Sequence, residues 1–157
     1  MASVVAPIYS AYLALETARR KRGTLELDLP EREIILAPDG SVARISQAPR
    51  YDSHKLIEEF MIAANVAAAE TLEAHKTSCV YRVHDQPDAA KLEGLREMLA
   101  GFGLKLSTRG HITPLNLNQI LAKAADGPNQ HLISTLVLRA QARAEYSPHN
   151  FGHFGLA

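Results

Sequence analysis

The sequence predicts an α+β fold in which helices dominate. Several long stretches carry apolar residues at helical spacing, which is typical of amphipathic helices. Between residues 24 and 46, three shorter runs have the character of strands. Glycines and prolines stand at several boundaries between these runs. The length of 157 residues suits one domain.

The first part of the chain predicts one helix followed by a small antiparallel β meander. The helix is expected from Ile8 to about Arg22. Arg19 to Arg22 would lie in its last turn, where cations suit the negative helix end, and Gly23 is a natural stop. The expected strands are Thr24–Leu27, Glu33–Leu36 and Ser41–Ser46. Pro38-Asp39-Gly40 supplies the turn between the last two strands.

The rest of the chain predicts several long helices that pack with this meander. Asp52-Ser53 can cap a helix that runs to about His75. The further elements expected are a strand at Cys79–His84 and helices at 88–100, 114–125 and 129–145. The tail from Tyr146 onward contains Pro148, Gly152 and Gly155, and it is expected to be loop and extended chain.

The composition limits the possible functions. Lys plus Arg and Asp plus Glu both number 17, so no basic signature of the whole chain points to nucleic acid. A nucleic-acid role would have to come from a local site. Cys79 is the one cysteine, which excludes an internal disulfide. No stretch approaches the roughly 20 apolar residues of a membrane span, and the N-terminus is a poor signal peptide, so we expect a cytoplasmic protein without membrane contact.

The helix expected from Ser53 carries polar residues where its apolar stripe should be buried. On a helical projection Glu58 and Asn65 fall within this stripe. The face predicted to be solvated carries Glu59, Glu70 and Glu73. Because a buried carboxylate without a partner costs several kcal/mol, Glu58 requires either a partner or a ligand.

Two interpretations of Glu58 stay open. It could pair with a core arginine, such as Arg82 or Arg139, and only stabilise the fold. Alternatively, Glu58 and Asn65, seven residues apart on one helix, could touch the same ligand in a polar cleft. Arg139 has two interpretations as well, because it lies at the margin of the core stripe of the last helix. It could be a surface arginine with a buried stem, or a clamp for phosphate or carboxylate.

Other site types find little support. His149 and His153 are four residues apart, as zinc ligands on a helix would be. However, Pro148 and Gly152 argue against a helix there, and no glutamate stands between the two histidines. We therefore expect no metal ligands in this chain. His84, at the end of an apolar strand, is interpreted as a core histidine.

Several segments together resemble one family. They are RRKRGTLELDLPE, DSHKLIEEFMIAANVAAAETLE, YRVHDQPDAAKLEGLREMLAGFGL, LVLRAQARAEYSP and GHFGLA, from about residue 6 to Ala157. Their order and spacing resemble the RNB-domain 3′-to-5′ exoribonucleases of the ribonuclease R and ribonuclease II type, and ribonuclease R most. The resemblance implies the RNB catalytic fold. It also implies processive hydrolysis of RNA from the 3′ end to nucleoside 5′-monophosphates, with Mg²⁺ as cofactor and the 3′ end of single-stranded RNA as partner.

The resemblance also implies roles for single residues. Glu58 matches the first glutamate of the family motif I-E-E-x-M-I and would contact the ribose near the scissile end. A 2′-hydroxyl is the group that distinguishes RNA from DNA. Leu27, or alternatively its neighbour Glu26, falls where related enzymes have a phenylalanine that stacks on the terminal base. Leu27 could pack on a base but not stack. His153 matches the histidine of H-[FY]-G-L and would shape the floor of the active site.

The family's metal site is absent from this sequence. That site is a cluster of closely spaced aspartates, whereas the aspartates here are 28, 39, 52, 85, 88 and 126. Two-metal hydrolysis needs oxygen ligands that converge on both ions. The family's downstream T-S-P-I-R-R-Y segment, its cold-shock domains and its S1 domain are absent too. We therefore expect residues 1–157 to be part of an RNB catalytic domain, without catalytic residues and inactive alone.

Three functional hypotheses follow. The chain could be a segment of an exoribonuclease that acts with the missing remainder of the RNB domain. It could be a non-catalytic RNA-binding or adaptor module derived from that domain. It could also be an interaction module without an RNA role. In each case the apolar surface that flanking segments would cover predicts self-association.

Overall fold

The computed structural model describes residues 2–27, 29–107 and 111–157, and their fold is α+β as predicted. The helices are α1 (Ala2–Arg22), α2 (Asp52–Ala74), α3 (Ala89–Ala100), α4 (Pro114–Ala124), α5 (Gln130–Ala140) and the short 3₁₀ helix η1 (Phe154–Leu156). The strands are β1 (Arg32–Leu36), β2 (Val42–Gln47), β3 (Tyr81–Val83) and β4 (Glu145–Ser147). The two strand pairs, β1 with β2 and β3 with β4, are both antiparallel.

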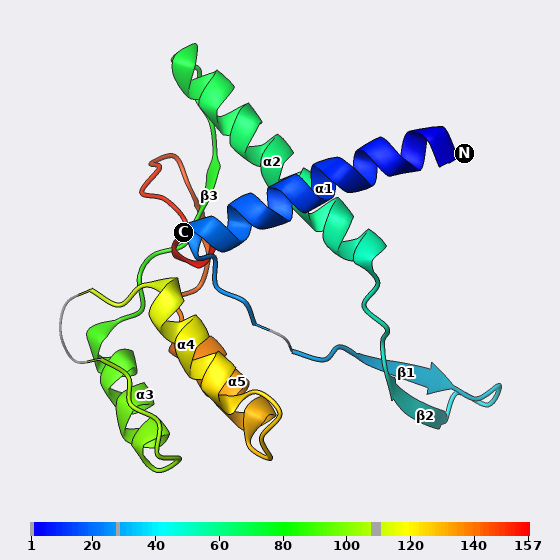
Figure 1. Cartoon of the computed structure of the whole chain (residues 1–157), viewed down its shortest axis with the longest axis vertical. Helices are drawn as coiled ribbons and strands as arrows, with labels where there is room; N and C mark the ends of the chain where they lie inside the picture. The colour runs from blue at the N-terminus through cyan, green and yellow to red at the C-terminus, as the bar shows by residue number, and fades with distance from the viewer. Residues whose placement is uncertain (1, 28, 108–110) are drawn as a thin grey trace.

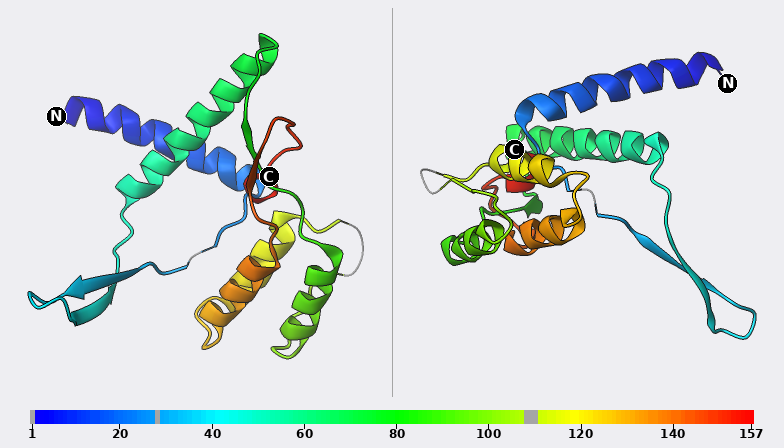
Figure 2. Two further views of the ribbon diagram at one scale, coloured as in Figure 1. Left: turned by 180° about the vertical axis from the view of Figure 1, so that it is seen from behind. Right: turned by 60° about the horizontal axis from the view of Figure 1, so that its bottom comes forward.

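The five described α-helices and the β1–β2 hairpin form three groups in space, and β3, β4 and η1 lie near the C-terminus (Figure 1). The long helices α1 and α2 cross one another, α3 to α5 form a bundle, and the β1–β2 hairpin projects away from both, as the two further views also show (Figure 2). The C-terminus returns to the end of α1, where the Leu25 N–H donates to the carbonyl of Gly155 at 2.9 Å. Residues near 20 and near 155 are therefore neighbours.

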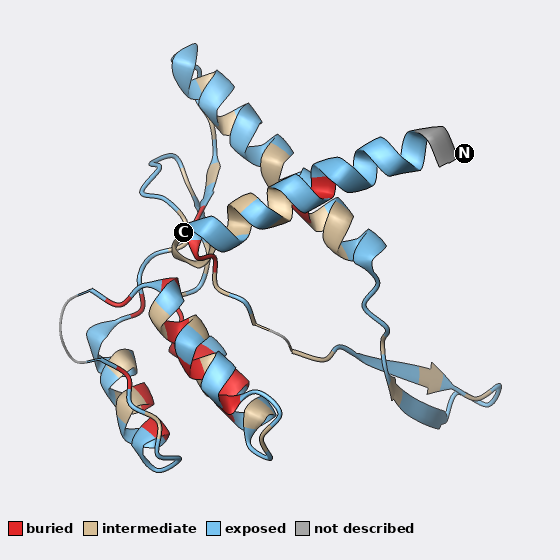
Figure 3. Ribbon diagram, in the orientation of Figure 1, coloured by how far each residue is buried: buried red, intermediate tan, exposed pale blue. Residues whose placement is uncertain are grey.

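The hydrophobic core lies in the helical bundle. Its buried members are Leu95, Leu99, Leu106, Ile112, Leu117, Ile120, Ala124, Ile133, Val137 and Ala140. Leu25, Leu27 and Phe154 pack against this cluster from outside. By contrast, burial along α1 and α2 is confined to a small area where the two helices cross (Figure 3). The stability of the crossing therefore depends on few side chains.

The hairpin exposes an apolar face. Ile34 lies opposite Ile45, and Leu36 lies opposite Val42, so all four side chains share one side of the two-stranded sheet. Each of the four is 57–60% exposed. Apolar patches of this kind mark surfaces that are covered in an assembly. Self-association stays a prediction that this exposure supports.

The predicted strand at Thr24–Leu27 is wrong, and so is the three-stranded meander. This segment is irregular, and its backbone groups are bonded by other partners. The amide of Asn118 on α4 accepts from the Glu26 N–H at 2.9 Å and donates to the Thr24 carbonyl at 2.8 Å. The side chain of Asn118 and the C-terminal segment form hydrogen bonds with backbone groups of this segment. These groups therefore do not require a neighbouring strand as partner.

The predicted helix to Glu145 also ends too late. Helix α5 stops at Ala140, and Gln141 turns into extended backbone at φ −66° and ψ 152°. The Gln141 side chain donates to the Val137 carbonyl at 3.0 Å, which satisfies a carbonyl at the helix end. Glu145 then begins β4, which pairs with β3. Pairing with a strand some 60 residues earlier overrides the local helical pattern.

Substituting Gly23 by alanine should lower the free energy of unfolding by about 2–5 kcal/mol, the sum of left-handed strain and overlap. Gly23 follows α1 at φ +80°, and an added Cβ would lie 2.8 Å from Cδ2 and 2.9 Å from Cδ1 of Leu115. Gly40→Ala is the control, since Gly40 has φ +82° but no atom within 4 Å of its would-be Cβ. Equal losses in urea denaturation for the two variants would show that the Leu115 contact contributes nothing.

Candidate RNA-binding site

The crossing of α1 and α2 contains a buried ion pair. The Arg19 guanidinium donates through Nη1 to Oε1 of Glu59 at 2.6 Å. The Glu59 side chain is 4% exposed and that of Arg19 is 22% exposed. Tyr12 is buried beside them, and burial, followed by the charges of Glu16 and Asp52, raises the pKa of its phenol. The prediction that Glu59 belongs to a solvated face is therefore wrong.

Glu58, the preceding residue, is much more exposed than Glu59. Its side chain is 46% exposed, and Nη2 of Arg50 donates to its Oε2 at 2.8 Å. Its partner is thus a surface arginine, and the predicted pairing with Arg82 or Arg139 is wrong. Asn65 is exposed as well. The two residues do not interrupt a buried stripe, because Ile57 and Met61 are 56% and 59% exposed.

Glu58 lines a cavity of about 730 Å³, which we call the Glu58 cavity. Its charged lining residues are Glu16, Arg19, Arg20, Glu26, Arg50, Lys55, Glu58 and Glu59. Leu25 and Leu27 form part of its wall, whereas Asn65 does not line it. The structure therefore brings Glu58 and Leu27 to one cavity, and it leaves Asn65 outside.

A second cavity, of about 680 Å³, lies where α1, α5 and the C-terminal segment meet, and we call it the basic cavity. Its cationic lining residues are Arg19, Arg82, Lys91, Arg139 and Arg143. None of the described residues that line it is an aspartate or a glutamate. A concave surface whose charged side chains are all positive attracts anions such as phosphate.

Three residues singled out in the sequence meet at the basic cavity. Leu27 reaches it from the segment after α1, Arg139 from α5 and His153 from the C-terminal tail. Arg139 is exposed, as the phosphate-clamp interpretation requires. Because Arg19, Leu25 and Leu27 line both cavities, the basic cavity and the Glu58 cavity adjoin at these side chains.

Two histidines hold the C-terminal segment in this place. The carbonyl of Ala142 lies 3.1 Å from Nε2 of His84, and the Gly155 N–H donates to Nδ1 at 3.2 Å. These contacts connect the His84 ring to the segment after α5 on one side and to the C-terminal tail on the other. The ring of His153 packs edge-on against the His84 ring at 4.9 Å between centroids. Burial, then the proximity of His84, lowers the pKa of His153, so His153 lines the basic cavity as a neutral ring.

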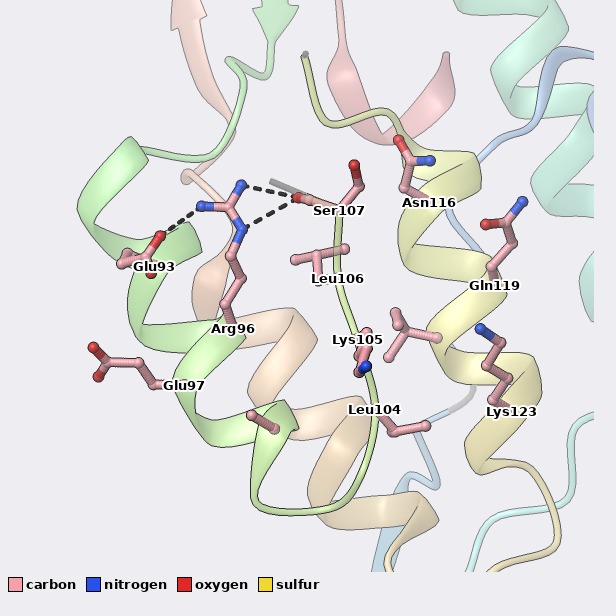
Figure 4. Close-up of a pocket in the computed structure, with 12 residues that line it drawn as sticks. Glu93, Arg96, Glu97, Leu104, Lys105, Leu106, Ser107, Asn116, Gln119 and Lys123 are labelled. Atoms are coloured by element: carbon pink, nitrogen blue, oxygen red, sulfur yellow. Dashed lines mark hydrogen bonds and ion pairs between the residues drawn. The ribbon is translucent and has the colours of Figure 1, made fainter. Parts of the chain in front are cut away.

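A third cavity, between α3 and α4, differs in character (Figure 4). Arg96 lies along its wall, where Nη1 donates to Glu93 at 2.6 Å while Nε and Nη2 donate to the Ser107 carbonyl. Its remaining charges are mixed, since Glu97, Lys105 and Lys123 all line it. Since its arginine already has partners and its charges have both signs, we exclude it from the candidate site.

Sequence reasoning missed most of the basic residues. Arg19 was assigned only to the helix end, and Arg82, Lys91, Arg143 and Arg50 carried no signal for a site. Four basic residues in succession, Arg19 to Arg22, could have raised the question of which of them points inward. Which of these residues points inward depends on where α2 crosses α1, and a local sequence pattern does not predict that crossing.

Within residues 2–27, 29–107 and 111–157, no group of three or more His, Cys, Asp or Glu side chains could hold a metal ion. The described residues therefore do not fit the metal site that the family resemblance implies. None of the helices in the described part of the chain is long and apolar enough to cross a membrane.

Comparison with known proteins decides the family. A sequence model of the RNB domain matches residues 3–157. This chain belongs to the RNB domain family. It is 42% identical over 146 residues to ribonuclease R of Aquifex aeolicus, a match that covers 93% of this chain and 21% of that protein. It is 37% identical over 150 residues to ribonuclease R of Escherichia coli, covering 96% of this chain and 18% of that protein.

Solved RNB structures share this fold. The apo form of Mycoplasma genitalium RNase R superposes with a TM-score of 0.89 at 25% identity, over 98% of this chain and 24% of that one. The same protein in complex with ribose methylated single-stranded RNA gives the same TM-score, identity and coverage. The present chain spans about a fifth of the length of these curated relatives. The roles of Glu58, Asn65, Leu27, Arg139 and His153 in binding RNA stay predictions.

Proposed function

We propose that this RNB segment holds the 3′-terminal part of single-stranded RNA within a 3′-to-5′ exoribonuclease. One observation carries the proposal. Leu27, Arg139 and His153, which are far apart in the sequence, converge on a cavity that has five cationic lining residues and no carboxylate. Cations in a groove that follow a phosphate backbone, with apolar side chains against bases, are typical of single-strand binding.

The two adjoining cavities contact different parts of the RNA. The cations of the basic cavity other than Arg19, which is paired with Glu59, bind phosphates, and Arg139 and Arg143 reach them from the end of α5 and just after it. Leu27, between the cavities, packs against a base. Glu58 accepts a hydrogen bond from a ribose hydroxyl in the neighbouring cavity. In the whole enzyme Mg²⁺ would activate the water that releases nucleoside 5′-monophosphates. The described residues do not fit that ion, so the roles that we assign to them are binding roles.

A non-catalytic RNA-binding module is the second candidate. It is favoured by the six scattered aspartates of the sequence, which cannot form the family's cluster. The two candidates differ in what must accompany the chain. A cluster of closely spaced aspartates encoded in the same gene or an adjacent one supports the exoribonuclease segment, and its absence supports the binding module.

The isolated chain should bind a 3′-single-stranded RNA in a salt-dependent manner without releasing mononucleotides. We expect the logarithm of affinity to fall linearly with the logarithm of salt, with a slope of about −0.7 for each phosphate contact. Fluorescence anisotropy across a salt series measures the slope. Incubation with Mg²⁺ followed by chromatography measures mononucleotides, and their release, if EDTA abolished it, would contradict the binding-only roles.

Two variants locate the binding surface. Arg139→Ala together with Arg143→Ala should weaken binding and reduce the slope by about 1.4, because two phosphate contacts are lost. Lys105→Ala together with Lys123→Ala removes the same charge from the third cavity and should leave the slope unchanged. Equal effects of the two pairs would reject the basic cavity as the RNA-binding surface.

A further inference from the structure

Two consecutive glutamates of α2 have separate arginine partners on the same cavity. Glu59 is bound to Arg19 and is buried, whereas Glu58 is bound to Arg50 and is half-exposed. All four side chains line the Glu58 cavity. The first pair connects two helices, so its role is structural. The role of the second pair requires a different explanation.

The backbone holds Arg50 in place on both sides. Before it, the Ala48 N–H donates to the Glu31 carbonyl at 2.9 Å and closes the base of the hairpin. After it, the Tyr51 carbonyl accepts from the His54 N–H at 3.0 Å and begins α2. The guanidinium therefore approaches Glu58 from a fixed point rather than from a free loop.

The ion pair uses only one oxygen of Glu58. Nη2 of Arg50 donates to Oε2, and no described residue donates a hydrogen bond to Oε1. The two side chains are 47% and 46% exposed, and an ion pair with such exposure contributes little to stability. A glutamate without such a contact would lose rotamer freedom when it binds a ligand. The ion pair therefore fixes the direction of Oε1 of Glu58, although it contributes little to the stability of the fold.

We propose that Arg50 is a positioning residue for sugar discrimination. By holding Oε2, Arg50 presents Oε1 of Glu58 to a ribose hydroxyl in the Glu58 cavity. This inference rests on the proposed RNA-binding function. It differs from a direct role of Arg50, because a guanidinium that bound a phosphate would favour RNA and DNA equally.

The test is the ratio of affinities for RNA and DNA. Dissociation constants of the intact chain are measured by anisotropy for a single-stranded RNA and for the DNA of the same sequence. We expect Arg50→Gln to lower the preference for RNA about three- to tenfold, since Glu58 must then give up rotamer freedom on binding. Arg50→Lys should retain part of the preference. Arg44→Gln removes an exposed hairpin arginine that lines neither binding cavity and should leave the ratio unchanged.

The same Arg50 substitution in a chain that lacks Glu58 distinguishes positioning of Glu58 from a direct contact of Arg50 with the nucleic acid. In a Glu58→Ala chain, Arg50→Gln should cause no further change in the ratio, because the carboxylate that it orients is gone. Equal weakening of RNA and DNA by Arg50→Gln would overturn the inference and make Arg50 a phosphate contact. An unchanged ratio would overturn it while leaving the proposed function intact. If the wild-type chain bound neither RNA nor DNA, the proposed function and this inference would both fail.

Discussion

Glu59→Ala should lower the free energy of unfolding by about 3–5 kcal/mol, as measured by urea denaturation. The substitution leaves the Arg19 guanidinium largely buried without its counter-ion. Nε of Arg19 already has no hydrogen-bond partner among the described residues, so the carboxylate is its main compensation. Because burial at the α1–α2 crossing involves little besides this pair and Tyr12, we expect the packing of the two helices to loosen.

The neighbouring residue provides the matched control. Glu58→Ala removes the same group from the same helix, but its ion pair with Arg50 is half-exposed and should contribute at most about 1 kcal/mol. Arg19→Met combined with Glu59→Leu should recover most of the stability, since no charge is then left buried. If the two glutamate substitutions cost the same, the crossing does not depend on the Arg19–Glu59 pair.

Local signals predicted the helices better than the site. The helix ends at Arg22 and Ala100 and the start at Pro114 follow from capping and chain-breaking residues, which act over a few positions. The first helix begins earlier than predicted, at Ala2, and therefore contains Pro7, although a proline inside a helix removes one backbone hydrogen bond. The strand predicted at Cys79–His84 shortens to Tyr81–Val83, since its partner β4 is only three residues long.

The exchange of roles between Glu58 and Glu59 has a specific cause. The helical projection assumed that the apolar stripe of α2 faces the core, which would bury Glu58. In the structure this stripe stays exposed at Ile57 and Met61, and α1 crosses α2 on the side of Glu59. A projection identifies which residues share a face, but only tertiary contacts decide which face is buried.

The basic cavity was beyond sequence reasoning for a similar reason. Arg82, Arg139 and His153 belong to β3, α5 and the C-terminal tail. The pairing of β3 with β4 and the bridge between His84 and His153 bring them together. Such contacts join residues about 60 to 70 positions apart, and no periodic pattern records them. The family resemblance suggested Leu27 and His153, and the helical pattern suggested Arg139. The structure adds Arg19, Arg82, Arg143 and Lys91 around them.

Glu58→Ala should reduce the preference of the chain for RNA over DNA by about ten- to a hundredfold, which is the value of a hydrogen bond to a charged acceptor. RNA loses the acceptor for a ribose hydroxyl, whereas DNA has no hydroxyl to lose and should bind equally well or better. Since the ion pair with Arg50 is exposed, the melting temperature should change little.

The same anisotropy measurement, beside a thermal melt, checks this prediction. Glu70→Ala is the control, because Glu70 is exposed on the same helix and lines neither binding cavity. It removes an equal charge, so any general effect of charge on nucleic-acid affinity appears in both variants and cancels from the ratio. An RNA-to-DNA ratio that Glu58→Ala leaves unchanged would reject the ribose contact. A large loss of stability with an unchanged ratio would make Glu58 a structural residue, as Glu59 is.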